Sequence, residues 1–299
     1  MHFPKFSRLY GLGAIILSMA YLSTTQAAEK SPLPHNDRVQ IGVPLSLFQG
    51  VPEWQRRLGV APFLKMMKQF TGRDGDIQFI TTADELARKI HDGVIDIGVF
   101  QGHEFAFSNP KYPDLLPITV ADPIDPVQSF CLVRWNCDAR NIGDLKDKKL
   151  VLPDLHRDHC DMFLNKQKKE FMKDGSFKLQ TKAATAENAI SEVIDGDCDC
   201  TVVDFIALNY YKNMYPGQFK NLKILSQSEV LPNACIVIKK AGGVDETTAN
   251  RFCSALIKAT DNPMGRGMLT TWKLKGFEKV PPIYHAQLKK VRDTYSPPQ

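Results

Sequence analysis

Residues 156–161, with the sequence HRDHCD, bring together imidazole, carboxylate and thiol groups, which are the side chains that bind transition metals. Their spacing matches no standard zinc module, because structural zinc needs a second Cys or His pair at a defined separation. Cys198 and Cys200 stand too close together to supply that pair. A metal site completed by His103 from another part of the fold is an alternative, but we predict neither a resident metal nor a cofactor.

Residues 156–161 do not have the arrangement that nucleophilic catalysis needs. Cys160 follows His159 directly, and adjacent residues in a helix do not face each other. The sequence contains no G-x-S-x-G elbow, no H-E-x-x-H, no G-x-x-x-x-G-K phosphate loop and no G-x-G-x-x-G after its first strand. We predict that the protein is not an enzyme. The alternative, a thiol enzyme, would lose its turnover in Cys160→Ser.

Two charged residues are candidates for contact with a ligand. A helix predicted to begin near Asp158 would offer free amide groups and a favourable dipole to an anion, and Arg157 could add a bidentate contact to phosphate, sulfonate or carboxylate. The alternative is a solvated loop with a surface arginine. Asp204 directly follows a buried apolar run, so it either pairs with a cation of the ligand or caps the next helix.

The hydrophobic pattern predicts the elements that must position these groups. Apolar runs indicate strands at 39–45, 76–82 and 95–100, and helical spacing indicates a helix over 59–70. A capping box at Thr82 opens another helix. Strands alternating with helices predict α/β layers.

In open α/β sheets, ligands meet the loops after the carboxyl ends of strands. The loops that fit this rule are 46–54, 101–104, 154–159 and 204–205. The candidate ligand-binding residues are Phe48, Gln49, Gln101, Gly102, His103, His156, Arg157 and Asp204.

A weak internal repeat indicates two similar lobes. Residues Thr82-Ala-Asp, Asp92-Gly93, Asp96 and Val99 recur 103 positions later as Thr185-Ala-Glu, Asp195-Gly196, Asp199 and Val202. Each copy reads as a capped helix, a glycine stop and a buried strand. Proline-rich residues 117–129 and the segment 231–234 are the predicted crossovers. They place residues 32–126 plus 233–299 in lobe 1 and residues 127–232 in lobe 2, with a hinge over a ligand-binding cleft.

The N-terminus predicts export. Residues 1–27 have the pattern of a signal peptide, with Lys5 and Arg8 before an apolar run and small residues at the cleavage site near Ala27. An uncleaved anchor is the alternative, but the run is shorter than the roughly 20 residues of a spanning helix. Export to an oxidising periplasm makes the seven cysteines disulfide candidates, with at least one left over.

Composition limits the remaining classes. The chain has 299 residues, of which 43% are hydrophobic and 24% charged, as in a globular protein with two domains. The net charge of +5 is small, and no basic block is interleaved with aromatic residues. We therefore predict no nucleic-acid partner.

Four stretches together resemble the phosphonate-type solute-binding proteins of ABC importers. They are residues 141–152 (NIGDLKDKKLVL), residues 92–102, residues 196–204, and the tail from Ile236 to Phe277. The resemblance implies a two-lobed type II periplasmic-binding-protein fold of the α/β class. Each lobe would hold a mixed, mostly parallel sheet flanked by helices, and two hinge crossovers would join the lobes.

The resemblance also implies a function: capture of a small ligand for an ABC permease or another periplasmic or membrane partner. The family usually holds its ligand's acidic head with a Ser/Thr-rich loop, and residues 154–159 (DLHRDH) are bulky and partly acidic at that place. A phosphonate, another small anion or metabolite, an amine and a metal species all remain candidate ligands. The alternative functions are a periplasmic accessory or redox-partner protein with the same fold and a metal-binding protein.

Overall fold

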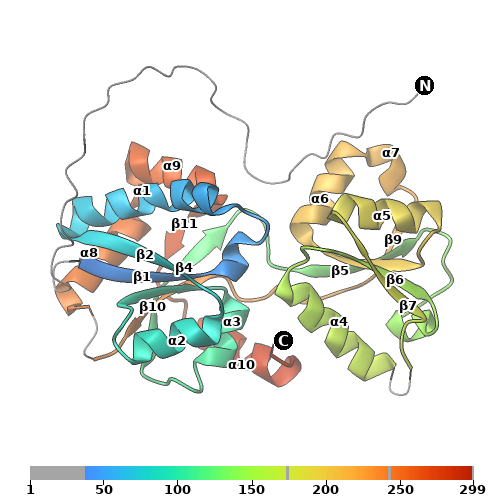
Figure 1. Ribbon diagram of the computed structural model, residues 1–299, viewed down its shortest axis with the longest axis horizontal. Helices are drawn as coiled ribbons and strands as arrows, with labels where there is room; N and C mark the ends of the chain where they lie inside the picture. Colours follow the sequence, from blue (N-terminus) through green and yellow to red (C-terminus); the bar gives the residue numbers. More distant parts are fainter. Residues whose placement is uncertain (1–37, 173–174, 242–243, 298–299) are drawn as a thin grey trace.

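The computed structural model describes residues 38–172, 175–241 and 244–297, which form two lobes, each built around one mixed sheet (Figure 1). The first sheet has the order β11-β4-β10-β3-β1-β2 and the second β7-β6-β8-β5-β9. The strands of the first are β1 (Arg38–Pro44), β2 (Asp74–Ile80), β3 (Ile97–Phe100), β4 (Leu115–Pro123), β10 (Cys235–Lys239) and β11 (Leu274–Glu278). Those of the second are β5 (Ser129–Arg134), β6 (Lys149–Pro153), β7 (Leu179–Ala183), β8 (Cys200–Asp204) and β9 (Leu222–Gln227).

Helices cover both faces of each sheet, as the α/β pattern predicts (Figure 1). Around the first sheet lie η1 (Leu45–Phe48), α1 (Glu53–Thr71), α2 (Ala83–His91), α3 (Gly102–Ser108), α8 (Glu246–Ile257), η3 (Ala259–Asp261), α9 (Pro263–Trp272) and α10 (Tyr284–Thr294). Around the second lie η2 (Ile142–Leu145), α4 (Asp158–Phe171), α5 (Ala186–Asp195), α6 (Phe205–Met214) and α7 (Pro216–Phe219).

Strand direction in both sheets is mixed. In the first sheet β1 to β4 run one way, and β10 and β11 run the other way. In the second sheet β5 alone opposes the remaining strands described there. Two of these opposed strands, β5 and β10, directly follow the crossovers between the lobes. The predicted fold class is therefore confirmed.

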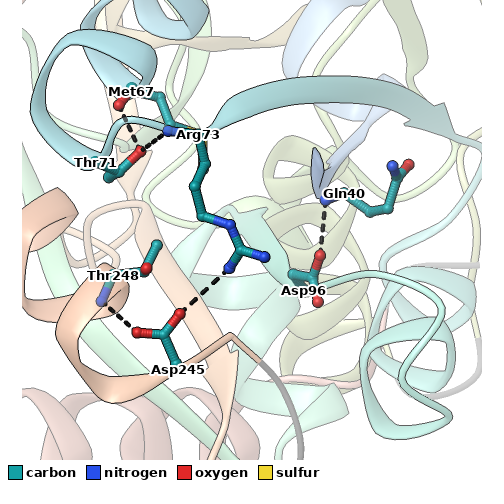
Figure 2. Close-up of polar contacts among 7 residues, drawn as sticks. All are labelled: Gln40, Met67, Thr71, Arg73, Asp96, Asp245 and Thr248. Carbon is teal, nitrogen blue, oxygen red and sulfur yellow. Dashed lines mark hydrogen bonds and ion pairs between the residues drawn. The ribbon is translucent and has the colours of Figure 1, made fainter. Parts of the chain in front are cut away.

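The internal repeat corresponds to the same local build in both lobes. Thr82 and Thr185 each cap their helix by accepting a hydrogen bond from a backbone N–H three residues later. The side chain of Asp96 accepts from the backbone N–H of Gln40 on β1 at 2.8 Å, as Figure 2 shows. Asp199 accepts from the N–H of Lys149 on β6 at 2.7 Å in the same way. Each aspartate thus links the start of its own strand to the neighbouring strand of the sheet, β3 to β1 in lobe 1 and β8 to β6 in lobe 2.

Polar contacts also tie the end of α1 to α8 at the far edge of the first lobe (Figure 2). Thr71 Oγ1 donates to Met67 O at 2.7 Å and accepts from Arg73 N at 3.2 Å. The Arg73 guanidinium reaches Asp245 at 3.2 Å, and Asp245 in turn caps α8 through Thr248 N. The sequence predicted α1 to begin at residue 59, but the helix begins at Glu53, directly after Pro52, and continues through Gly59.

The two crossover segments lie side by side between the lobes. Leu231 N donates to Val127 O at 2.9 Å, and Ala121 N donates to Ala234 O at 2.8 Å. Met162 of α4 is buried in the hydrophobic cluster of lobe 1, so the lobes also contact each other through side chains near the crossovers. The lobe boundaries at 126/127 and 232/233 fall in these segments and stay predictions.

The expected disulfides are not present: all seven cysteines are free thiols. They are distributed over both lobes, with Cys235 and Cys253 in lobe 1 and the other five in lobe 2. The predicted signal peptide, residues 1–27, lies outside the described residues. In the part of the chain that the structure describes, no helix combines the length and the apolar character needed to span a membrane.

Candidate functional site

A cavity of about 660 Å³ lies where the loop after β1 meets the starts of α2, α3 and α4. Lobe 1 supplies most of its lining, and Leu155 and Asp158 come from lobe 2. The lining residues are Leu45, Ser46, Phe48, Gln49, Gly50, Val51, Arg56, Thr81, Thr82, Ala83, Asp84, Glu104, Phe107, Ser108, Lys111, Leu155, Asp158 and Pro297. The predicted loops 46–54, 101–104 and 154–159 all contribute to it. The loop 204–205 does not.

Glu104 places a buried carboxyl group in the wall of this cavity. It is 5% exposed, accepts a hydrogen bond from the Ser46 hydroxyl, and accepts a second from the backbone N–H of Gln101 at 3.1 Å. The second bond closes a capping box at the start of α3. Burial raises the pKa of Glu104, the two hydrogen bonds lower it, and the charge of Asp158 raises it, which together place it at about 7.

Asp158 faces lobe 1 from the first turn of α4. Gln49 Nε2 donates to Asp158 Oδ1 at 3.2 Å, which joins the two lobes at the cavity. Burial is the largest of the effects that raise the pKa of Asp158. Its neighbour Arg157 donates from Nη1 to the carbonyl oxygen of Ser46 at 3.4 Å, a second polar contact between the lobes.

Arg157 and Asp204 lie together in lobe 2. Arg157 Nε is 3.8 Å from Asp204 Oδ2, and Asp204 Oδ1 accepts from Ala207 N at 2.7 Å. Asp204 therefore caps α6, the second of the two roles that its position after a buried strand allows. The guanidinium expected to contact an anion is paired with a carboxylate of the chain itself.

His103 and His159 face each other across the contact between the lobes. Their ring centroids are 5.8 Å apart, the rings are tilted by 64°, and the side chains are 2% and 7% exposed. Burial lowers the pKa of each to about 3, so both imidazoles are neutral near pH 7. Among the residues that the structure describes, His103 Nδ1 and His159 Nε2 have no hydrogen-bond partner.

His156 points back into its own lobe. Its Nδ1 is 2.9 Å from Pro153 O, its Nε2 is 2.8 Å from Asp161 Oδ1, and the bond to Asp161 raises its pKa. His156 and the pair His103–His159 therefore do not converge, and no group of three potential metal ligands forms within the described residues. Cys160 is buried, which raises the pKa of its thiol and makes it a poor nucleophile.

The remaining predicted site residues occupy different places. Phe48 and Gln49 line the cavity. Gln101 is the N-cap of α3, and Gly102 lies against the second crossover, where an added Cβ would be 2.2 Å from Pro232 O. Of these residues, Phe48 and Gln49 therefore lie at the cavity, and Gly102 packs against the second crossover.

Comparison with known proteins decides the family. The family model described as "ABC transporter, phosphonate, periplasmic substrate-binding protein" matches residues 55–282. The chain belongs to this family of phosphonate-type binding proteins. No curated protein sequence matches it.

Solved structures show the same fold at low sequence identity. XAC2383 from Xanthomonas citri, solved with ATP bound, has a TM-score of 0.61 and 14% identity, covering 86% of this chain and 99% of that one. PhnD1 from Prochlorococcus marinus, in complex with methylphosphonate, has a TM-score of 0.60 and 13% identity, covering 86% and 97%. A binding-protein component of an ABC phosphonate transporter from Pseudomonas aeruginosa has a TM-score of 0.59 and 13% identity, covering 85% of each chain. These matches support the type II periplasmic-binding-protein fold.

Sequence reasoning missed the carboxyl groups that mark the cavity of this phosphonate-type binding protein. The sequence pattern predicts a helix start at Asp158 and a loop at Glu104, with no sign that the two carboxyl groups line one cavity. One signal was present: Gln101 and Glu104 stand three residues apart at a helix start, which is capping-box spacing. Ser46 gave no signal, because its contact with Glu104 joins residues 58 positions apart.

Proposed function

We propose that this protein is exported to the periplasm, captures a small solute between its lobes and delivers it to an ABC permease. The observation that carries the proposal is the cavity of about 660 Å³ to which both lobes contribute, since a pocket of this size holds a small molecule. The side-by-side crossovers support it, because a short double connection allows one lobe to rotate on the other. Membership of the family of periplasmic substrate-binding proteins agrees with this function.

The test combines thermal unfolding with solution scattering on the purified protein. The panel holds phosphonates, phosphate, sulfonates, small carboxylates, amines and divalent metals with a chelator control. A solute at 100 times its dissociation constant stabilises the folded state by about 2.7 kcal/mol. We expect one solute class to raise the unfolding temperature and to reduce the radius of gyration.

A different result would favour the accessory-protein alternative. If no solute changes either measurement while a pull-down from periplasmic extract yields a stable stoichiometric complex, the protein acts through a macromolecular partner. Solute capture would then be wrong for this chain.

A further inference from the structure

Two carboxyl groups meet at the cavity without a cation. Glu104 accepts hydrogen bonds from the Ser46 hydroxyl and the Gln101 backbone N–H, and Asp158 accepts one from the Gln49 amide. Within the described residues neither carboxyl group forms an ion pair. They come from opposite lobes and line the same cavity, and the charge of Asp158 raises the pKa of Glu104. A buried carboxylate is costly unless a cation or a proton compensates it.

Of the two cations that line the cavity, Lys111 is paired with a carboxylate and Arg56 keeps one donor without a partner among the described residues. Lys111 Nζ lies 2.5 Å from Asp84, which also lines the cavity. Arg56 stacks on the ring of Phe79 at 5.1 Å and lies close enough to Glu53 to lower its pKa. Arg56 Nε has no hydrogen-bond partner in the described part of the chain, so Arg56 is the lining residue best placed to contact an anionic group of a solute.

Arg157 and His156 of lobe 2 are engaged by groups of the chain itself. Arg157 pairs with Asp204 and donates to Ser46 O, and His156 pairs with Asp161. Arg157 and His156 lower the pKa of Asp158 through space, but burial outweighs them.

Side chains of the protein cap the starts of α2, α3 and α6, whereas the start of α4 has no side-chain cap. The first-turn carboxyl group of Glu104 fills the start of α3, Asp204 caps α6, and Thr82 caps α2. The first turn of α4 carries Asp158 and Asp161, so its amide groups stand beside negative charge. An oxyanion would have to compete with these groups, because helix N-termini bind anions only through free amides.

We infer that the solute of this cleft is a small organic ammonium ion, bound with its nitrogen between Glu104 and Asp158. This inference rests on the proposed function. Phe48, Phe107 and Leu155 line the same cavity and suit the hydrocarbon part of such a solute. A metal ion fits less well, because no third ligand converges with the two carboxyl groups in the described part of the chain.

The chemistry of Glu104 makes ammonium binding pH-dependent. Its pKa is about 7, and besides its hydrogen-bond partners the groups that face it are Asp158 and the Cys235 thiol. A bound cation favours the charged form, so binding releases a proton. The apparent affinity should therefore rise about tenfold from pH 6 to pH 8.

The experiment uses n-butylamine as the probe and 1-butanol as the uncharged molecule of the same shape. Calorimetry and thermal unfolding are run at matched ionic strength and at both pH values. We expect n-butylamine to bind and stabilise, 1-butanol and methylphosphonate to have no effect, and Glu104→Gln and Asp158→Asn each to weaken n-butylamine at least tenfold. Asp76→Asn, which removes an exposed carboxylate of β2 outside the cavity, is the matched control and should bind as the unmodified protein does.

The outcomes separate this inference from the proposed function. Stabilisation by methylphosphonate or zinc chloride without any effect of n-butylamine overturns the ammonium ion while leaving solute capture intact. Equal binding of n-butylamine and 1-butanol also overturns it, because the carboxyl groups would then play no part. Loss of binding in Asp158→Asn with unchanged unfolding temperature supports it even if Glu104→Gln folds poorly.

Discussion

At the scale of single residues, the buried carboxyl group of Glu104 links the cavity to stability. An acid whose pKa is raised by folding binds more protons in the folded state than in the unfolded state. Its contribution is therefore favourable at low pH and is lost as the pH rises from the unfolded value of 4.5 to about 7. The Ser46 and Gln101 hydrogen bonds reduce this cost without removing it.

We expect the free energy of unfolding to fall by about 2–3 kcal/mol more in the unmodified protein than in Glu104→Gln between pH 5 and pH 8. Urea unfolding at both pH values measures the difference, and all other titrating groups are shared. Parallel pH profiles of the two proteins would show that Glu104 ionises in the folded state as readily as in the unfolded chain.

The neutral pair His103 and His159 changes the free energy of unfolding with pH in the opposite direction. Folding lowers the pKa of each to about 3, so the unfolded chain binds more protons below pH 6.5 and stability is lost as the pH falls. Between pH 7 and pH 5 we expect the unmodified protein to lose about 2 kcal/mol more than His103→Gln. His285→Gln, at an exposed position of α10, is the control and should follow the unmodified protein. An equally steep acid loss in His103→Gln would contradict the assignment.

At the scale of elements, the start of α3 is packed against the second crossover. Gly102 faces the carbonyl oxygens of Pro232 and Asn233, and an added Cβ would lie 2.2 Å and 2.5 Å from them. Both contacts are to backbone, so the crossover or the helix must move to make room. The glycine that the sequence marked as a ligand-loop residue thus holds the element that presents Glu104 close to the hinge.

Gly102→Ala should lower the free energy of unfolding by about 1–3 kcal/mol through this overpacking. Gly267→Ala in α9, where nothing lies within 4 Å of the added Cβ, should instead raise it by about 0.5–1 kcal/mol, because alanine favours the helix. Urea unfolding of both variants gives the comparison. An equal change in the free energy of unfolding in the two variants would mean that the crossover moves at little energetic cost to make room for the Cβ.

The sequence predicts some helices and strands correctly and misses the contacts between them. Local signals such as the Thr82 and Thr185 caps and the apolar runs placed α2, α5, β3 and β8 correctly, because caps and periodicity are properties of neighbouring residues. Contacts over long sequence separations could not be predicted. The pairing of Arg157 with Asp204 turned a candidate anion contact into an internal ion pair, and no local pattern encodes it.

At the scale of the whole molecule, the lobes are joined by two kinds of contact. Near the crossovers Met162 of α4 is buried in the core of lobe 1, and His159 of α4 meets His103 of α3 edge to face. At the cavity the hydrogen bonds between the lobes join Gln49 with Asp158 and Arg157 with Ser46 O, and Leu155 lies against Gly50. Polar contacts of this kind contribute only about 0.5–1.5 kcal/mol each, so the cavity side should open more easily than the crossover side.

Removing the contacts at the cavity should therefore shift the free protein toward an open form. In Gln49→Ala combined with Arg157→Ala, neither side-chain hydrogen bond between the lobes at the cavity can form, while Met162 and the histidine pair are untouched. We expect a larger radius of gyration by solution scattering, with the unfolding temperature lowered by only a few degrees. Arg251→Ala, which removes an exposed arginine of α8, is the control for loss of charge. An unchanged radius of gyration in the double variant would place the whole restraint at the crossovers, so that the cavity side would have no part in holding the lobes together.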